Sequence, residues 1–267
     1  MRPARAIDGQ MRCRVLAVLL ILGIATPSAA QGPFDASPYQ PPTDDRTGTN
    51  PLNLQHQIDV WNAFLDLETL YLNSTTYRHA VPFFHRRVRL SGLVPFGVSN
   101  LTGATESGIG DVGADLEWTP WLAEGRGLVA GVRTTWNTSS SEGLGYGGTH
   151  TLMPYAQYVH EVSPRLRIAP FFGYRIGVGG NDFAATYKDL ITGVMAVWPT
   201  TDRTWIATTP QIVFDLSNDR TYGDVGGEVG VMVLEHVGTY GRLSLGFGRD
   251  GEKPYDWGVT FGVRFVP

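Results

Sequence analysis

Charged side chains recur at every second position in several segments of this 267-residue sequence. Arg87 and Arg89 show the pattern, and so do Asp115 and Glu117. Alternate residues of an extended chain lie on one face, so such rows can bind a polar solute or neutralise one another across strands. The pattern predicts one shared inner surface for Arg87, Arg89, Asp115, Glu117, Arg133, Arg167, Arg175, Asp215, Glu228, Arg242 and Arg264.

The residues that usually carry catalysis lack the spacing that catalysis needs. The six histidines form no His-x-His or His-x₃-His pair on a clear face and have no cysteine partner, so no metal site is predicted. No histidine is followed two residues later by serine, as in barrel-type acyl hydrolases, and no G-x-S-x-G sequence occurs. The Gly-rich stretches 143–148 and 177–180 lack the Lys-Ser/Thr of phosphate-binding loops. We therefore predict a protein that is not an enzyme and has no cofactor.

Alternation of apolar and polar residues indicates that β-strands position the charged rows. Residues 257–265 alternate aromatic or branched side chains with Gly, Thr and Arg, which is the two-residue period of a strand. From about residue 54 onward, no segment keeps the 3.6-residue apolar period of a helix for more than two turns. Similar alternation occurs at 87–96, 112–118, 128–137, 166–177 and 242–248, and more weakly at 151–161, 187–198, 205–216 and 224–236.

The composition of the two faces favours a transmembrane barrel over a soluble β-sandwich. Gly, Arg, Asp and Glu share one face, and small residues there make room for long charged side chains inside a narrow barrel. The other face is rich in Val, Leu, Phe and Trp, as contact with lipid requires, and a sheet in lipid must close. Ten good segments lie between residues 84 and 265, and residues 54–78 can supply two more. We predict an all-β, antiparallel, up-and-down barrel of 12 strands, with 10 as the alternative, because bacterial single-chain barrels use even numbers.

The connections between segments also fit an outer-membrane barrel, which has short turns at one end and long loops at the other. Aromatic residues gather near both ends, among them Trp118, Trp205 and Tyr240 near short turns and Trp136 and Trp257 near long loops. Such groups resemble the aromatic girdles at the two membrane interfaces. Short connections are predicted at 119–126, 162–164, 199–203 and 237–241, and long ones at 98–110, 138–150, 178–186, 217–223 and 249–255.

The N-terminus has the features of a secretory signal peptide. Arg12 and Arg14 precede an apolar run over residues 15–25, and small residues ending at Ala30 predict cleavage there. The run is shorter than the roughly 20 residues of a spanning helix. We predict a signal peptide over 1–30, an extended periplasmic lead-in over 31–53 and an outer-membrane barrel over 54–267. The single cysteine, Cys13, precedes the apolar run and leaves with the signal peptide.

The charge balance excludes one class of partner. The chain has a net charge of −4, and only Lys188 and Lys253 are lysines, whereas a nucleic-acid binder shows a clustered basic face. Removal of residues 1–30 takes away four Arg and one Asp, so the net charge falls from −4 to −7. We predict outer-membrane lipid, the barrel-assembly machinery and a small-molecule solute as partners, and no nucleic acid.

Residues 107–112 carry a resemblance to a known family. Their sequence, Ser-Gly-Ile-Gly-Asp-Val, leads into an alternating strand ending at Trp118-Thr119-Pro120, and this layout resembles the phenol-degradation MetA-like family of outer-membrane transporters. The resemblance implies a barrel that moves hydrophobic or aromatic compounds. From the residues themselves we expect a structural motif: two glycines allow a tight turn into the strand, and the aspartate bonds nearby amides. The motif residues are Ser107, Gly108, Gly110 and Asp111.

The charged inner surface allows two functional interpretations. Interspersed charges of both signs can select a small solute in a constricted pathway, which is the interpretation that we favour. The same charges can instead form a salt-bridged plug that only stabilises a structural barrel. An adhesive barrel, in which loops 98–110 and 138–150 bind a partner at the cell surface, is a further alternative.

Overall fold

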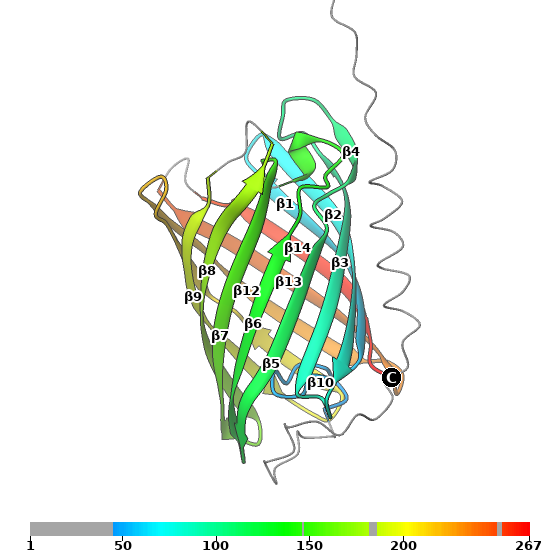
Figure 1. Ribbon diagram of the computed structural model, residues 1–267. Coiled ribbons are helices and arrows are strands. Elements are labelled where there is room, and N and C mark those ends of the chain that lie inside the picture. Colours follow the sequence, from blue (N-terminus) through cyan, green and yellow to red (C-terminus); the bar gives the residue numbers. More distant parts are fainter. Residues whose placement is uncertain (1–44, 146, 182–185, 250–252) are drawn as a thin grey trace, which may run out of the picture.

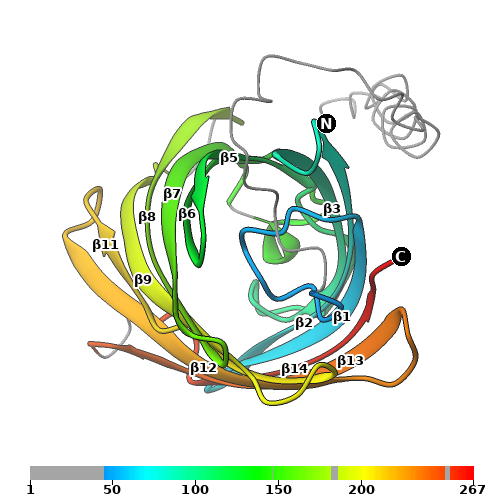
Figure 2. The same cartoon turned by 90° about the horizontal axis from the view of Figure 1, so that it is seen from below.

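The protein forms one closed antiparallel β-sheet. The computed structural model describes residues 45–145, 147–181, 186–249 and 253–267, so the predicted signal peptide and Cys13 lie outside the described residues. The last strand pairs with the first, from Ile58–Phe265 to Asp66–Trp257, and this pairing closes the barrel (Figures 1 and 2). Within the described residues, no helix is long and apolar enough to cross a membrane.

The strand bounds follow the predicted segments closely. A short 3-10 helix, η1 (Glu142–Leu144), interrupts one connection. The strands are β1 (Gln57–Leu67), β2 (Leu70–Phe83), β3 (Val88–Ser99), β4 (Glu106–Ile109), β5 (Gly113–Ala123), β6 (Arg126–Thr135), β7 (Thr149–Ser163), β8 (Leu166–Gly180), β9 (Lys188–Pro199), β10 (Thr204–Thr208), β11 (Gln211–Asp215), β12 (Arg220–Met232), β13 (Val237–Gly248) and β14 (Trp257–Phe265).

Fourteen strand segments occupy twelve positions around the barrel. β4 and β5 share one position, because both pair with β3 at different heights. β10 and β11 share another, because both lie between β9 and β12. The predicted 12-stranded all-β antiparallel barrel is therefore confirmed, and the ten-stranded alternative is wrong. The two strands that decide the count are β1 and β2.

The two ends of the barrel have different connections. At the end where β1 begins and β14 ends, turns of two to four residues join the strands, at 84–87, 124–125, 164–165, 200–203 and 233–236. At the opposite end most connections are longer, although residues 68–69 join β1 to β2 and residues 216–219 join β11 to β12; β4 and η1 lie at this end (Figure 1). Residues 217–223, predicted as a long loop, mostly belong to β12, because residues from Arg220 onward pair with β11. We call the first end the turn end and the second the loop end.

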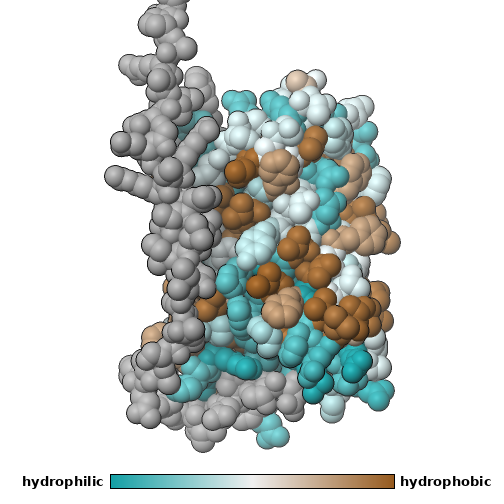
Figure 3. Space-filling model, turned by 90° about the vertical axis from the view of Figure 1, so that its right-hand side faces the viewer, coloured by the Kyte–Doolittle hydropathy of each residue, from teal (hydrophilic) through white to brown (hydrophobic). Residues whose placement is uncertain are grey.

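The barrel wall has an apolar outer face. Side chains such as Val229, Leu243 and Phe261 are more than half exposed, and their neighbours along each strand point inward. In the space-filling view of one side, hydrophobic side chains spread over the wall, while hydrophilic ones gather toward the turn end (Figure 3). A soluble protein would bury these side chains, so the outer face is suited to lipid.

Four predicted girdle residues, Trp118, Trp121, Trp205 and Tyr240, show how strand pairing sets side-chain direction. A β-bulge between Trp118 and Trp121 shifts the register by one residue, so both tryptophans are exposed on the outer face. β5 accordingly continues past Thr119-Pro120 to Ala123. Trp205 and Tyr240 were predicted in the girdle, but they are buried inside the barrel, because they share the strand face of the inward arginines.

An N-terminal segment, residues 45–56, lies across part of the opening at the turn end, as the view from below shows (Figure 2). It contacts several sides of the wall. Leu52 packs into an apolar cluster with Leu122, Val129, Val159 and Ala169. On the opposite side the Thr47 carbonyl accepts a hydrogen bond from Arg264 Nη1 at 3.0 Å. We call residues 45–56 the plug segment.

Candidate functional site

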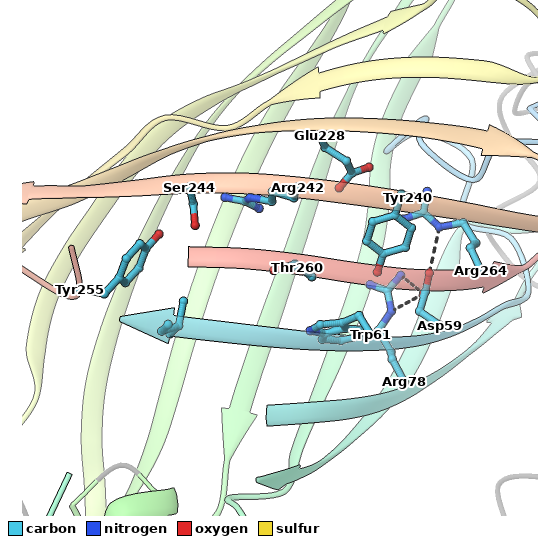
Figure 4. A pocket seen from close by; sticks show the side chains of 11 residues that line it. Asp59, Trp61, Arg78, Glu228, Tyr240, Arg242, Ser244, Tyr255, Thr260 and Arg264 are labelled. Atoms are coloured by element: carbon cyan, nitrogen blue, oxygen red, sulfur yellow. Dashed lines mark hydrogen bonds and ion pairs between the residues drawn. The ribbon is translucent and has the colours of Figure 1, made fainter. Parts of the chain in front are cut away.

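The interior of the barrel is the candidate site, and its best-connected residue is Asp59 on β1. The strand register places Asp59 directly opposite Arg78 on β2 and Arg264 on β14. Asp59 Oδ2 lies 2.6 Å from Arg78 Nη2, and Asp59 Oδ1 accepts a hydrogen bond from Arg264 Nε at 2.9 Å (Figure 4). Asp59 is thus held by two arginines across the seam where the barrel closes.

Arg264 is also held by aromatic rings. Its guanidinium carbon lies 5.4 Å from the ring centre of Trp205 and 5.2 Å from that of Tyr240, within the range of cation–π attraction. Trp205 in turn donates from Nε1 to Glu228 Oε1 at 2.7 Å. Glu228, Trp205, Arg264 and Asp59 therefore form one connected network, of which Figure 4 shows Glu228, Arg264 and Asp59 facing the interior.

A second network lies on β3, β5, β6 and β7. Asp115 Oδ2 accepts hydrogen bonds from Nε and Nη2 of Arg133, at 3.1 and 2.8 Å. Its other oxygen accepts one from the Tyr155 hydroxyl at 2.9 Å. Arg89 on β3 lies directly opposite Glu117 on β5, and their charged groups approach to 2.5 Å. Cross-strand pairing of opposite charges thus neutralises this part of the wall.

The remaining charged residues pair in the same cross-strand manner. Arg175 binds Asp189 opposite it, and Arg167 Nε lies 2.8 Å from Glu161 Oε1. Arg242 Nη2 lies 3.5 Å from Asp224 Oδ1, and the other oxygen of Asp224 accepts a hydrogen bond from Gln211 Nε2 at 2.6 Å.

Two residues that were predicted for the inner surface lie elsewhere. Arg87 is buried in the turn after β2, and Asp215 accepts hydrogen bonds from the amides of Ser217 and Asn218 at the loop end.

The structure also brings in interior residues that the sequence-based set omits. Most of them contact a predicted arginine, and those on β7 and β10–β13 lie on the same strand face as a predicted residue or directly opposite one. Tyr155, for example, is directly opposite Gly131, which shares a face with Arg133. The added charged residues and hydrogen-bonding aromatics are Asp59, Arg78, Tyr155, Glu161, Trp205, Asp224 and Tyr240.

Two cavities lie inside the barrel. One has a volume of about 340 Å³ and is lined by the Asp59 network together with Arg242 and Tyr255 (Figure 4). The other has a volume of about 450 Å³ and is lined by Arg133, Tyr155 and Arg175 among others. Gln211, which lines the second cavity, donates a hydrogen bond to Asp224. Asp224 in turn contacts Arg242, which lines the first cavity, so these three side chains link the two cavities. Each cavity mixes charged and aromatic side chains, so the interior suits a small amphipathic molecule.

The motif at residues 107–112 holds an inward-folded loop at the loop end. Asp111 Oδ1 accepts hydrogen bonds from the amides of Thr138 and Ser139, both at 2.9 Å. Leu144 of η1 lies against the glycines of the motif, and a Cβ at Gly110 would lie only 2.7 Å from the Leu144 carbonyl oxygen. The expected bonding of Asp111 to nearby amides is thus present, and the glycines leave room for η1. Ser107 is exposed on the outer face of β4.

Replacing Gly110 with valine should displace η1 from the wall, because the added side chain would collide with the Leu144 backbone. We expect a barrel that still folds, since the collision lies outside the strand pairs, and a larger single-channel conductance than that of the wild type. Conductance in planar bilayers is the measurement, with heat-modifiable gel mobility as the check on folding. An unchanged conductance in a folded variant would show that η1 does not narrow the pathway.

Glu106 on β4 also holds this loop and makes it sensitive to pH. Hydrogen bonds from the Ser141 hydroxyl, and more weakly from the Gly143 amide and Thr102, lower the pKa of Glu106 below its usual 4.5. A lowered pKa means that the ionised Glu106 carboxylate stabilises the loop in its position against the wall. This stabilisation is complete above about pH 4.5 and is lost as the pH falls through the lowered pKa. We expect conductance to rise at about pH 3, and Glu106→Gln to remove that rise. An equal rise in Glu106→Gln would assign it to other carboxylates.

No cluster of three or more His, Cys, Asp or Glu residues in the described parts of the chain is arranged to hold a metal ion. The structure does bring two histidines together: Nε2 of His56, the last residue of the plug segment, lies 2.8 Å from Nε2 of His79 on β2. Burial and the neighbouring His79 both lower the pKa of His56. The pair therefore favours uncharged rings that share one hydrogen bond.

Comparison with known proteins shows the same fold. An outer-membrane channel from Pseudomonas putida F1 aligns with a TM-score of 0.66 and 13% identity, over 90% of this chain and 100% of that chain. The NanC porin aligns with a TM-score of 0.59 and 11% identity, over 79% of this chain and 100% of its own. The KdgM porin gives 0.57 and 10%, over 79% and 99%. No family model matches the sequence, and no curated protein matches it.

Proposed function

We propose that this protein is an outer-membrane β-barrel whose interior passes small solutes across the membrane. The observation that carries the proposal is the arrangement of two charged, aromatic-lined cavities inside a wall whose outer face is apolar. A purely structural barrel of this width would gain nothing from open space between its charged rows. The solved structures that share the fold are named as channels or porins, which supports the same function.

The apolar outer face supports an outer-membrane location. Exposed apolar side chains on most strands need lipid, and a closed sheet satisfies the backbone within it. The predicted cleaved signal peptide over 1–30 would deliver the chain across the inner membrane, and the barrel-assembly machinery would insert it. Both remain proposals, as does membership of the MetA-like family suggested by residues 107–112.

The size and lining of the cavities support small solutes with an apolar part. Tyr155, Phe171 and Met153 line the larger cavity, and Trp61 and Tyr240 line the smaller one. Volumes of about 340 and 450 Å³ are large enough for a single-ring compound. This agrees with the hydrophobic or aromatic compounds that the family resemblance implies.

The rival function is a closed barrel that is structural or adhesive. Two observations favour it: the plug segment lies across the turn end, and η1 lies against the inner wall at the loop end. Under that alternative, deleting loop residues in 98–110 or 138–150 should abolish binding of a surface partner and leave the membrane sealed. Under the proposed function, the same deletion leaves flux intact or increases it.

Planar-bilayer recording and liposome uptake with the purified protein test the proposal. We expect small discrete current steps and uptake of single-ring solutes above the rate of protein-free liposomes. Absence of both, with protein that shows heat-modifiable gel mobility, would leave the closed barrel as the better account. A soluble protein without heat-modifiable mobility would contradict the membrane location itself.

A further inference from the structure

The walls of the two cavities are more basic than the barrel interior as a whole. Arg78, Arg242 and Arg264 line the smaller cavity, and Arg133 and Arg175 line the larger one. Only three acidic residues, Asp59, Glu117 and Glu228, share these linings within the described chain. The carboxylates that pair with Arg133, Arg175 and Arg242 do not line either cavity. The solute therefore meets five guanidinium groups and three carboxylates.

Side-chain exposure within the ion pairs shows the same asymmetry. The side chain of Arg133 is 51% exposed, whereas that of its partner Asp115 is 9% exposed. Arg242 is 33% exposed against 10% for Asp224, and Arg78, Arg175 and Arg264 also exceed their partners. Two pairs near the turn end have the reverse order, with Glu117 and Glu161 more exposed than their arginines. In most pairs the carboxylate lies against the wall and the guanidinium faces the cavity.

Two of these arginines retain hydrogen-bonding capacity toward a solute. Arg133 donates to Asp115 through Nε and Nη2, and its Nη1 has no hydrogen bond to any described residue. Arg242 makes a long contact of 3.5 Å with Asp224, beyond the usual length of a charge-assisted hydrogen bond. A guanidinium with spare N–H groups recognises a carboxylate well, because its planar donors match the two oxygens.

We propose that the pathway prefers anions, and that its solutes are small organic carboxylates, including aromatic ones, that contact Arg133 and Arg242 in turn. This inference rests on the proposed channel function and adds the charge of the solute to it. The buried carboxylates that pair with these arginines compensate most of the positive charge inside the barrel and stabilise it. Because the carboxylates are buried, the surface that a solute meets is still positive. Tyr155, 5.8 Å below the Arg133 guanidinium, and Phe171 offer the ring contacts that an aromatic carboxylate needs.

The reversal potential of the current in a KCl gradient tests the inference, with chloride as the probe. For the wild type we expect chloride to be several-fold more permeant than potassium. Arg133→Gln and Arg242→Gln should each reduce this ratio, and the double variant should reduce it further, whereas Arg133→Lys should retain most of it. Arg126→Gln is the matched control, because Arg126 begins β6 at the turn end and its guanidinium lies over Trp121 on the outer face.

Flux of three single-ring compounds extends the test to organic solutes. Relative to protein-free liposomes, which neutral compounds cross unaided, the protein should accelerate the entry of benzoate more than that of benzyl alcohol and much more than that of benzylamine, and Arg133→Gln should reduce benzoate entry selectively. Current without anion preference, or with cation preference, would overturn this inference and leave the channel function standing. Absence of any current would overturn both. The wild-type measurement alone separates these outcomes if a variant fails to fold.

Discussion

Leu52→Asp is expected to increase the single-channel conductance several-fold. Leu52 is buried among Leu122, Val129, Val159 and Ala169 at the turn end, and it fastens the plug segment to the wall. A carboxylate at this position would have no partner in the apolar cluster, and burying an unpaired charge costs several kcal/mol. The plug segment should therefore detach from the wall, and the opening that it partly covers should widen. Conductance in planar bilayers is the measurement.

Leu52→Ile is the matched control, because it preserves apolar character and volume and should leave conductance unchanged. The plug segment precedes β1, so its release does not remove strand pairs, and heat-modifiable mobility should be retained in both variants. If Leu52→Asp folds and conducts like the wild type, the plug segment does not limit the pathway. The description of residues 45–56 as an obstruction would then be wrong.

Asp59→Asn is expected to cause the largest loss of stability among the interior substitutions. Asp59 neutralises both Arg78 and Arg264, and the Arg264 side chain is only 11% exposed. Removing one partner of a buried ion pair costs about 3 to 5 kcal/mol, because the other charge is left uncompensated. The loss falls at the β1–β14 seam that closes the barrel. The midpoint of unfolding in urea, followed by gel mobility, is the measurement.

Asp66→Asn, on the same strand, is the control, since the Asp66 side chain makes no ion pair among the described residues. The double variant Asp59→Asn/Arg264→Gln should be less destabilised than the sum of the two single variants, because it removes both charges of one pair. Equal midpoints for Asp59→Asn and Asp66→Asn, or strict additivity in the double variant, would show that the network at Asp59 does not stabilise the seam.

The sequence predicts the barrel well because the alternation of side chains between the two faces of a strand is a local property of the sequence. Alternation in 242–248 and 257–265 is enough to place Arg242 and Arg264 on one face and Leu243 and Phe261 on the other. The strand count follows from the same period. The Ser-Gly-Ile-Gly-Asp-Val motif could be recognised as structural, although its partner loop at 136–145 lies in a separate connection.

The sequence reveals less about β1 and β2, where polar residues occupy the outer face. Asn62 Nδ2 donates to Asn73 Oδ1 at 2.6 Å and to Thr75 Oγ1 at 3.0 Å, all on the face opposite Asp59. These outward amides weaken the alternation, so Asp59 and Arg78 do not stand out as interior residues. The burial of the plug segment cannot be predicted from local sequence either, because it depends on contacts with strands far along the chain.

The positions of Trp205 and Tyr240 show a further limit. Tryptophan and tyrosine near strand ends are typical of a girdle, and composition alone cannot tell an outward ring from one that packs on an interior arginine. The strand register determines whether each ring points inward or outward: Tyr240 is directly opposite Gly262, and Trp205 is directly opposite Gly230. Each of these rings lies over an inward glycine, and an added Cβ at either glycine would collide with it. Inward glycines opposite large aromatics are therefore a usable signal.

The central claim, that solutes pass through the interior of the barrel, is tested most directly by thiol modification of two neighbouring residues. Arg242 lines the smaller cavity, and Leu243 is 69% exposed on the outer face of the same strand. Each is replaced by cysteine in a chain in which Cys13 is serine, and a charged methanethiosulfonate reagent is added during recording. We predict that the current through Arg242→Cys falls sharply while the current through Leu243→Cys does not change. Equal effects at the two positions, or none at Arg242→Cys, would contradict a pathway through the barrel interior.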